Sequence, residues 1–273
     1  MITADSTAAA APERAQQRSA FPDYRFAPNI GGHPEVYQLE NEAFDRAGHV
    51  LAALRSLAPW AGKTIVDLGC GTGYWLARYA REAARVIGIE PDDMVRAQAV
   101  RALSALALPR LDDPRPAVRP EVLPGSAEHT GLPDACADVV HARFAYFFPP
   151  GADAGLAEVL RILRPGGRLL VVDNDYRWGE FSGLLAAASR KPAREVADTV
   201  DQWWQARGAR RHEVRSELRF TRRQDLAAVL HIEFPAQVAR DWLTRHPLAT
   251  GLTYGYVLFE VARTASQASL AHP

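Results

Sequence analysis

Residues 66–75 read Val-Asp-Leu-Gly-Cys-Gly-Thr-Gly-Tyr-Trp, and this stretch decides the fold. It joins a β-branched run at 64–68, which predicts a buried strand, to a segment at 74–82 that predicts a helix. The three alternating glycines between them permit positive φ angles and let a ligand approach the backbone closely. The N-terminus of the following helix offers free N–H groups to an anion. The stretch therefore predicts a nucleotide-like ligand with an anionic end, bound at the carboxyl edge of a parallel sheet.

Strands and helices alternate along the chain on both sides of this stretch. Strand–helix alternation at short spacing predicts parallel βαβ units with right-handed crossovers. The fold class is therefore expected to be α/β, with a doubly wound, mostly parallel seven-stranded sheet and a helical lid. The other expected strands are 85–89, 121–123, 137–141, 168–173, 214–220 and an antiparallel 252–261. The other expected helices are 34–58, 92–108, 153–163, 177–208, 225–234 and 235–245.

We expect residues 23–265 to form a single domain. Its parts are an N-terminal helical cover, a ligand-binding core, a helical lid that includes the sixth strand, and a last strand. These parts span 23–58, 59–175, 176–250 and 251–265. Residues 1–22 show no apolar period and are expected to be a disordered tail, and 266–273 are expected to be a second tail.

The composition excludes several classes of protein. The chain has 32 basic and 32 acidic residues among 273, so its formal net charge of +0 disfavours nucleic acid or an anionic membrane as a partner. Two cysteines cannot build a four-thiolate metal site, and no metal site is expected. Without a secretory signal or a long apolar run, the protein is expected to be cytoplasmic. A homodimer is left open.

Two residues sharpen the prediction of the ligand. Tyr74 stands where a dinucleotide-binding dehydrogenase has its third glycine, and its bulk argues against a pyrophosphate site. Glu90 ends the second expected strand, seventeen residues after Gly73. An acid at this position of a doubly wound sheet accepts hydrogen bonds from ribose hydroxyls and repels a 2′-phosphate.

Four motifs in order resemble the class I S-adenosylmethionine-dependent methyltransferases. They are most similar to the small-molecule branch, which includes the ubiquinone/menaquinone C-methyltransferases. The resemblance covers about residues 60–173 and implies a Rossmann-like enzyme that methylates a small molecule. The aromatic residues expected to cover the strand ends would suit a flat organic acceptor. The motifs are 66–75, Glu90, Gly125-Ser126-Ala127-Glu128 ahead of Leu132-Pro133-Asp134, and Leu163-Arg164-Pro165-Gly166-Gly167-Arg168.

The resemblance also implies how S-adenosylmethionine would be held. Asp67 and the backbone of Gly69, Gly71 and Gly73 would hold its methionine part. Glu90 would accept hydrogen bonds from both ribose hydroxyls. These five residues lie at the ends of the first two strands, which are neighbours in such a sheet.

The adenine and the sulfonium would meet a second set of residues. Pro91 would pack on the adenine, and Ser126, Ala127 and Glu128 would face its edge. Family members often have Asp where Ser126 stands, so a side-chain contact to the adenine amine is open. Arg143 would border the sulfonium through its backbone carbonyl, because a cationic head is unfavourable beside a second positive charge.

A sulfonium methyl is already activated, so the enzyme mainly has to orient donor and acceptor. No catalytic residue is assigned, and a base is needed only if the acceptor keeps its proton at neutral pH. The candidate bases are Asp173, Asp175, Tyr146 and Tyr176. His129 and His141 are expected to be structural or solvated, and Trp203-Trp204 is expected to fix the lid to the core.

Two other functions stay open at this point. One is a nucleotide-dependent enzyme of another class, such as an aminopropyltransferase or a dehydrogenase. An aminopropyltransferase needs clustered acids to bind a polyamine, and 177–208 is not notably acidic. The other is a non-catalytic module that binds S-adenosylmethionine on the same fold.

Overall fold

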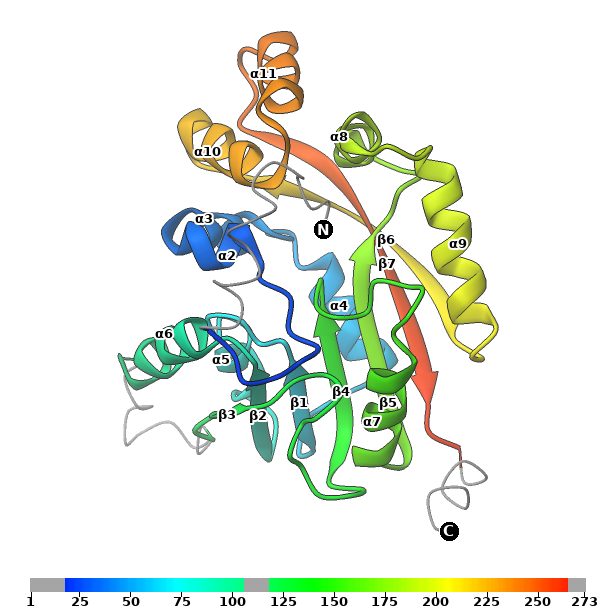
Figure 1. The fold of residues 1–273 in the computed structure, drawn as a ribbon. Coiled ribbons are helices and arrows are strands. Elements are labelled where there is room, and N and C mark those ends of the chain that lie inside the picture. The colour runs from blue at the N-terminus through cyan, green and yellow to red at the C-terminus, as the bar shows by residue number, and fades with distance from the viewer. Residues whose placement is uncertain (1–17, 106–117, 265–273) are drawn as a thin grey trace.

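The computed structural model describes residues 18–105 and 118–264, which build one seven-stranded sheet with helices around it (Figure 1). The strand order is β3-β2-β1-β4-β5-β7-β6. Neighbours from β3 to β5 pair in parallel, whereas β7 runs antiparallel to β5 and β6, so the predicted sheet is confirmed. The strands are β1 (Thr64–Leu68), β2 (Arg85–Glu90), β3 (Glu121–Pro124), β4 (Ala137–Arg143), β5 (Leu163–Asn174), β6 (Arg210–Arg219) and β7 (Gly251–Ala262).

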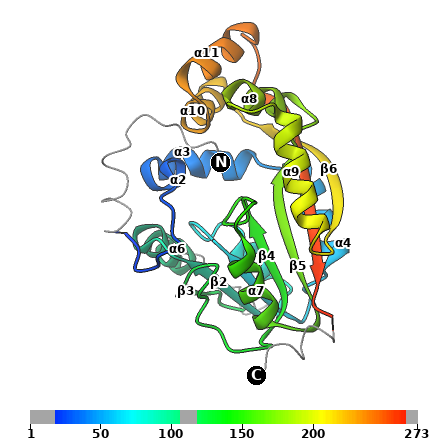
Figure 2. The same ribbon diagram turned by 45° about the vertical axis from the view of Figure 1, so that its right-hand side comes forward.

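The helices fall into two groups. Some flank the faces of the sheet, and others gather beyond the carboxyl ends of its parallel strands (Figures 1 and 2). The flanking helices are α4 (His49–Leu57), α5 (Leu76–Tyr79), α6 (Asp93–Ala105), α7 (Asp153–Ile162) and α9 (Ala193–Gln205). The helices beyond the strand ends are α2 (Pro28–Gly32), α3 (Pro34–Ala43), α8 (Glu180–Ala188), α10 (Arg223–Glu233) and α11 (Ala236–Arg245).

Successive strand residues pack into opposite layers of the core. In β1, Ile65 joins the cluster that contains Leu54 of α4 and Leu76 of α5. Its neighbour Val66 joins the cluster that contains Val159 of α7. Because side chains alternate along a strand, β1 is buried on both faces, as expected for the centre of a doubly wound sheet.

The predicted helix at 34–58 is two helices in the structure. Asp45 and Gly48 adopt positive φ angles of 47° and 77° between α3 and α4. The Asp45 carboxylate accepts hydrogen bonds from the backbone N–H groups of Val50 (2.8 Å) and Leu51 (3.1 Å), and so caps α4. The break turns α3 away from the sheet face, so that it lies over the strand ends.

Other boundaries also differ from the predictions. Helix 177–208 is divided into α8 and α9, with Pro192 as the N-cap of α9. Helix 74–82 is reduced to the short α5. Residues 18–22, which were assigned to a disordered tail, include Arg18, whose side chain lies 3.5 Å from Asp92. The predictions for 1–17, 106–117 and 265–273 lie outside the described residues.

The predicted fastening of the lid by Trp203-Trp204 is confirmed. Trp204 is buried and stacks on Phe259 of β7, with the ring centroids 5.2 Å apart. The ring of Trp204 also contacts those of Trp203 and Phe147, with centroids 4.8 and 5.5 Å away. Within 18–105 and 118–264, no helix has the length and apolarity needed to span a membrane.

Candidate active site

The glycine loop after β1 has the backbone that its sequence predicts. Gly69, Gly71 and Gly73 have φ angles of +69°, +57° and +79°. A Cβ at Gly69 would lie 2.5 Å from the Cβ of Ala145, and a Cβ at Gly71 would lie 3.0 Å from Ile30. Any other residue at Gly69 would therefore combine a strained backbone with a steric clash. The loop is built for close approach by its neighbours and by a ligand.

Glu90, at the end of β2, holds this loop in place. Its carboxylate accepts hydrogen bonds from the backbone N–H of Gly71 (2.9 Å) and from that of Asp92 (3.0 Å). Burial raises the pKa of Glu90 to about 7, although the two backbone hydrogen bonds lower it in part. A carboxylate oxygen has two lone pairs, so each oxygen can accept one further hydrogen bond from a ligand. The adjacent Pro91 is half-buried.

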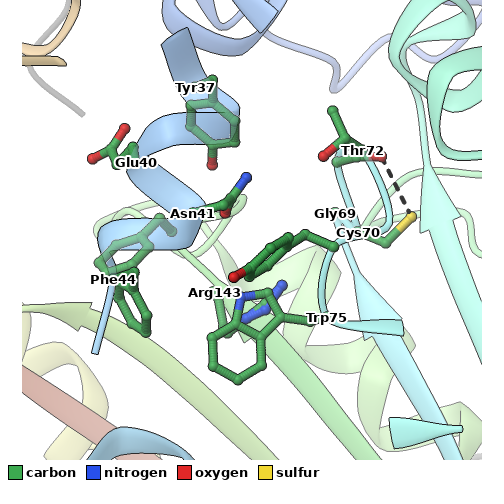
Figure 3. Close-up of a pocket in the computed structure, with 12 residues that line it drawn as sticks. Tyr37, Glu40, Asn41, Phe44, Gly69, Cys70, Thr72, Trp75 and Arg143 are labelled. Atoms are coloured by element: carbon green, nitrogen blue, oxygen red, sulfur yellow. Dashed lines mark hydrogen bonds between the residues drawn. The ribbon is translucent and has the colours of Figure 1, made fainter. Parts of the chain in front are cut away.

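A cavity of about 60 Å³ lies between α3 and the glycine loop (Figure 3). Figure 3 shows Tyr37 and Asn41 of α3 on one side, together with Phe44 just after that helix, and Thr72 and Trp75 on the other. The lining consists of aromatic side chains, a few polar groups and the glycine loop itself. It comprises Tyr37, Glu40, Asn41, Phe44, Gly69, Cys70, Gly71, Thr72, Tyr74, Trp75, Arg143 and Phe144.

Asp67 and Arg143 form a buried ion pair beside this cavity. The Arg143 Nη2 atom lies 3.2 Å from the Asp67 Oδ2 atom, and the side chains are 9% and 0% exposed. The guanidinium also lies over the ring of Trp75, 4.5 Å from its centroid. Burial raises the pKa of Asp67, and the Arg143 charge lowers it in part. Asp67 thus neutralises the guanidinium beside the cavity, and the expected contact of the Arg143 carbonyl with a sulfonium stays a prediction.

Several buried polar atoms around the cavity have no hydrogen-bond partner within the described part of the chain. They are Asp67 Oδ1, Thr72 Oγ1, and the Nε and Nη1 atoms of Arg143. A buried polar atom without a partner costs free energy, so these atoms are candidates to bind a ligand. Among these atoms, those of Arg143 can donate hydrogen bonds to a carboxylate, and the Asp67 oxygen can accept one from an ammonium.

The loop after β3 carries the residues expected at the adenine edge. Ser126 closes a turn, because its backbone N–H donates to the His129 carbonyl (3.0 Å) and its Oγ accepts from the His129 N–H (3.1 Å). Ala127 is buried. The carboxylate of Glu128 accepts a hydrogen bond from the hydroxyl of Tyr146 at 2.8 Å. The side chains of Ser126 and Glu128 are thus already engaged with the protein.

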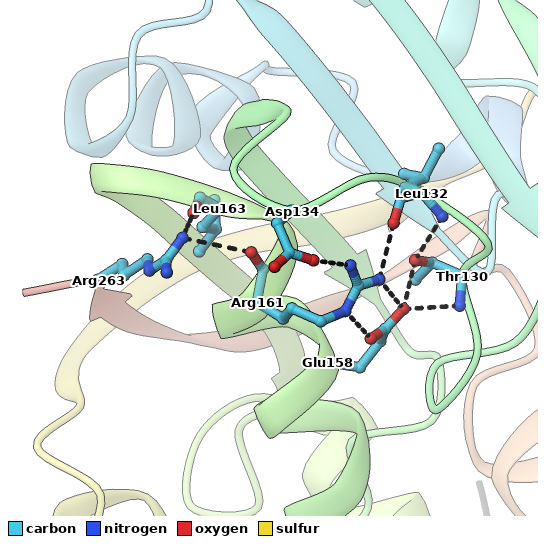
Figure 4. A network of polar contacts seen from close by, with 7 residues as sticks. All are labelled: Thr130, Leu132, Asp134, Glu158, Arg161, Leu163 and Arg263. Atoms are coloured by element: carbon cyan, nitrogen blue, oxygen red, sulfur yellow. Dashed lines mark hydrogen bonds and ion pairs between the residues drawn. The ribbon is translucent and has the colours of Figure 1, made fainter. Parts of the chain in front are cut away.

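A polar network fixes the far end of this loop (Figure 4). Glu158 accepts hydrogen bonds from the backbone N–H and the hydroxyl of Thr130, at 2.9 and 2.5 Å. Arg161 donates to the Leu132 carbonyl at 2.8 Å and also pairs with Asp134 and Glu158. These bonds anchor the loop to α7 and so set the position of its ligand-facing half.

The N-terminal segment crosses the same edge of the sheet. The hydroxyl of Tyr24 donates to Asp92 at 2.5 Å, and the Arg18 carbonyl accepts from the Asp93 N–H at 2.8 Å. Asp23 accepts from the Glu128 N–H at 3.3 Å. The segment therefore joins the loops after β2 and β3.

The four candidate bases do not line the described cavity. The carboxylate of Asp175 accepts from the Arg177 N–H at 2.9 Å. Burial raises the pKa of Asp173 and of Tyr176, and the hydroxyl of Tyr146 is bonded to Glu128.

The side chains of α3 that line the cavity were not identified from the sequence. The helical period of 34–58 shows which face of the helix is buried, but it does not show what that face meets.

The structural role predicted for His141 is confirmed, since it is buried against the Tyr79 hydroxyl at 3.0 Å. Burial lowers the pKa of His141 to about 3 and keeps it neutral.

Known proteins resemble this chain in the part that carries the glycine loop. Residues 66–171 match the family model described as a methyltransferase domain. An uncharacterised methyltransferase of Geobacillus kaustophilus is 24% identical over 64% of this chain and 74% of its own length. A 23S rRNA (uracil(1939)-C(5))-methyltransferase of Acidithiobacillus ferrooxidans is 35% identical over 55% of this chain and 31% of its own. The ubiquinone/menaquinone biosynthesis C-methyltransferase of Rubrivivax gelatinosus is 31% identical over 50% and 51%.

The fold also resembles solved structures. The YcgJ protein of Bacillus subtilis superposes with a TM-score of 0.54 at 15% identity, over 79% of this chain and 98% of that one. The sheet and its flanking helices therefore have the Rossmann-like arrangement that the sequence predicts. At this level of identity the likeness concerns the fold alone.

Proposed function

The chain belongs to the class I S-adenosylmethionine-dependent methyltransferases, and we propose that its acceptor is a small, flat organic metabolite. S-adenosylmethionine is accordingly its cofactor. The proposal rests above all on the cavity beside the glycine loop, which is small and lined with aromatic rings. Such a lining suits a flat molecule with few polar groups.

The residues around the glycine loop fit the cofactor. The loop backbone leaves room for close approach, and Gly69 admits no Cβ. We propose that the unpaired Nε and Nη1 atoms of Arg143, with Thr72, bind the carboxylate of the methionine part. The free oxygen of Asp67 is placed to accept from its ammonium, and Glu90 to accept from the ribose hydroxyls.

The loop after β3 would supply the adenine subsite. We assign to it the side chain of Ala127 and the backbone carbonyls of Ser126 and Glu128, because the polar side chains and the backbone N–H groups of the latter two are already bonded to the protein. Pro91 would pack against the ring. The Tyr24–Asp92 hydrogen bond would hold the N-terminal segment over the nucleoside and limit access of water.

The bound cofactor supplies an activated methyl group on a sulfonium. The protein has to orient the acceptor in line with it, and orientation alone can lower the barrier by about 7–11 kcal/mol. The rings of Phe44, Trp75 and Phe144 pack edge to face around the cavity. They form a rigid wall against which a flat acceptor can be held.

A nucleic acid is the competing acceptor, since one relative is named as an rRNA methyltransferase. The balanced charge of the chain favours the small molecule, because nucleic-acid binding draws most of its affinity from phosphate contacts. The position of α3 over the strand ends also favours it, because an RNA base would have to enter beneath a helix.

The proposal is tested by incubating the protein with methyl-labelled S-adenosylmethionine and either a metabolite extract or total RNA. Mass spectrometry then locates the label. We expect a labelled small molecule and unlabelled RNA. Label in RNA alone would overturn the small-molecule assignment, and binding of S-adenosylhomocysteine without any transfer would favour a non-catalytic module.

A further inference from the structure

Two half-buried glutamates lie close together under the lid. They are Glu40 of α3 and Glu233 of α10, and they lie where these two helices pack together. The side-chain amide of Asn29 donates to the Glu233 Oε1 atom at 2.7 Å. The Glu40 Oε2 atom is buried and has no hydrogen-bond partner in the described part of the chain. One acceptor of the pair is therefore unused in the folded protein.

Within residues 18–105 and 118–264, no lysine or arginine forms an ion pair with Glu40 or Glu233. The titratable neighbours are three tyrosines whose pKa is raised first by burial and further by the charge of Glu40. They are Tyr37, Tyr254 and Tyr256. Arg143, the cation that lines the cavity, is paired with Asp67. Burial raises the pKa of both carboxyls, and the charge of Glu233 raises that of Glu40 further, whereas the hydrogen bond from Asn29 lowers the pKa of Glu233 in part.

Glu40 also lines the cavity beside the glycine loop. Figure 3 shows its carboxyl group on the α3 side, at the opposite end from Thr72. The same cavity presents five aromatic rings, and aromatic faces attract cations. These rings belong to Tyr37, Phe44, Tyr74, Trp75 and Phe144. An acidic pair with a free acceptor, at the end of an aromatic cavity, is the chemistry that recognises a protonated amine.

We propose that the acceptor carries a protonated amine, and that Glu40, with Glu233 beside it, binds this amine at the end of the cavity. This inference rests on the proposed small-molecule methyltransferase activity and names the class of its acceptor. The ammonium donates to the free Oε2 of Glu40 and to Glu233, while Asn29 keeps its bond to Glu233. The rest of the acceptor extends along the aromatic walls toward the glycine loop.

A purely structural role for the pair makes a different prediction. Glutamine at Glu40 resembles the protonated carboxyl and can still donate to Glu233, so the contact between α3 and α10 would persist. It cannot provide the negative charge that an ammonium needs. Glu40→Gln therefore separates the two roles, and Glu233→Gln provides a second variant. Glu42→Gln, at an exposed position of the same helix, is the matched control.

The test measures binding of amines and their alcohol counterparts, such as benzylamine with benzyl alcohol and tryptamine with tryptophol, to protein saturated with S-adenosylhomocysteine. We expect an amine to bind about ten- to a hundredfold more tightly than its alcohol, since hydrogen bonds to charged groups are the stronger ones. The preference should disappear in Glu40→Gln and Glu233→Gln and persist in Glu42→Gln. No amine preference in the wild-type protein, or a preference that survives both pair variants, would overturn the inference.

The ammonium of the cofactor is the other source of the same chemistry. Titration of Glu40→Gln with S-adenosylhomocysteine and with methylthioadenosine, which lacks the amino acid, distinguishes the two. If only the first is weakened, the pair binds the cofactor and the assignment to the acceptor is overturned. If the wild-type protein binds neither compound, the proposed function itself fails. Unchanged binding of both, with loss of the amine preference, supports the inference.

Discussion

The carboxylate of Glu90 accepts a hydrogen bond from the backbone N–H of Gly71 at 2.9 Å, and so ties the end of β2 to the glycine loop after β1. The same carboxylate accepts from Asp92 at the start of the next helix. One side chain thus positions the loop expected to hold the methionine part and remains able to accept from a ribose. Its removal should affect both parts of the cofactor site.

Glu90→Ala is expected to weaken binding of S-adenosylhomocysteine about ten- to a hundredfold. Hydrogen bonds to a charged group contribute about 1.5–3 kcal/mol each, and the loop also loses its anchor. Calorimetric titration measures the change. Glu121→Ala, an exposed position whose carboxylate pairs with Arg85, is the control and should leave the affinity unchanged. Equal affinities of wild type and Glu90→Ala would remove Glu90 from the site.

The raised pKa of Glu90 predicts a dependence of stability on pH. Because the pKa is about 7 in the folded protein and near 4.5 otherwise, the fold favours the protonated carboxyl. The stability it provides is full below about pH 4.5 and is lost as the pH rises through about 7, by about 3 kcal/mol in all. Urea unfolding across this range should show the decline in the wild type and a much flatter profile in Glu90→Gln. Parallel profiles would contradict the assignment.

Gly69→Ala should abolish cofactor binding and destabilise the protein. The new Cβ would lie 2.5 Å from the Ala145 Cβ, at a φ of +69°. Overpacking of this kind costs about 1–3 kcal/mol, in addition to about 1 kcal/mol for the left-handed backbone. Gly62→Ala is a matched control, because its φ is +68° and nothing lies within 4 Å. It should show the backbone cost alone, with normal binding of S-adenosylhomocysteine.

Arg143→Met should lower the free energy of unfolding by about 3–5 kcal/mol, since it leaves Asp67 charged and buried. The double variant with Asp67→Asn should recover much of this stability, but it should not recover cofactor affinity. Chemical denaturation and calorimetry report the two properties separately. Full recovery of affinity in the double variant would show that the guanidinium serves only to neutralise Asp67.

Tyr24→Phe should speed the release of S-adenosylhomocysteine. It removes the 2.5 Å hydrogen bond to Asp92, which holds the N-terminal segment over the nucleoside region. The loss is expected to be about 1–2 kcal/mol, or a roughly tenfold increase in the dissociation rate. Stopped-flow displacement measures that rate. Arg25→Ala, at an exposed neighbouring position, should leave it unchanged, and equal rates for all three proteins would contradict a covering role.

The fold was predictable where residue type dictates local backbone. The glycine loop needs positive φ angles that few other residues adopt, and the β-branched runs on either side of it alternate with helices. The break between α3 and α4 was not predictable from the apolar period, which continues through it. It depends on Asp45, whose carboxylate caps α4 only once that helix has formed.

Only part of the candidate site could be assigned from the sequence. Asp67, Glu90 and the glycines follow strands, so their meeting at one sheet edge could be inferred. Glu40 and Glu233 belong to helices far apart in the chain, and only the packing of α3 on α10 brings them together. The orientation of Arg143 depends on the pairing of β4 with β1, which places it beside Asp67.

The crystal structure of the complex with S-adenosylhomocysteine tests the central assignment most directly. We predict that the ribose hydroxyls lie within hydrogen-bonding distance of Glu90, and that the amino-acid carboxylate contacts the guanidinium of Arg143. The adenine should lie against Pro91 and Ala127. A nucleoside bound away from the glycine loop, with Glu90 and Arg143 making only their present contacts, would contradict the account.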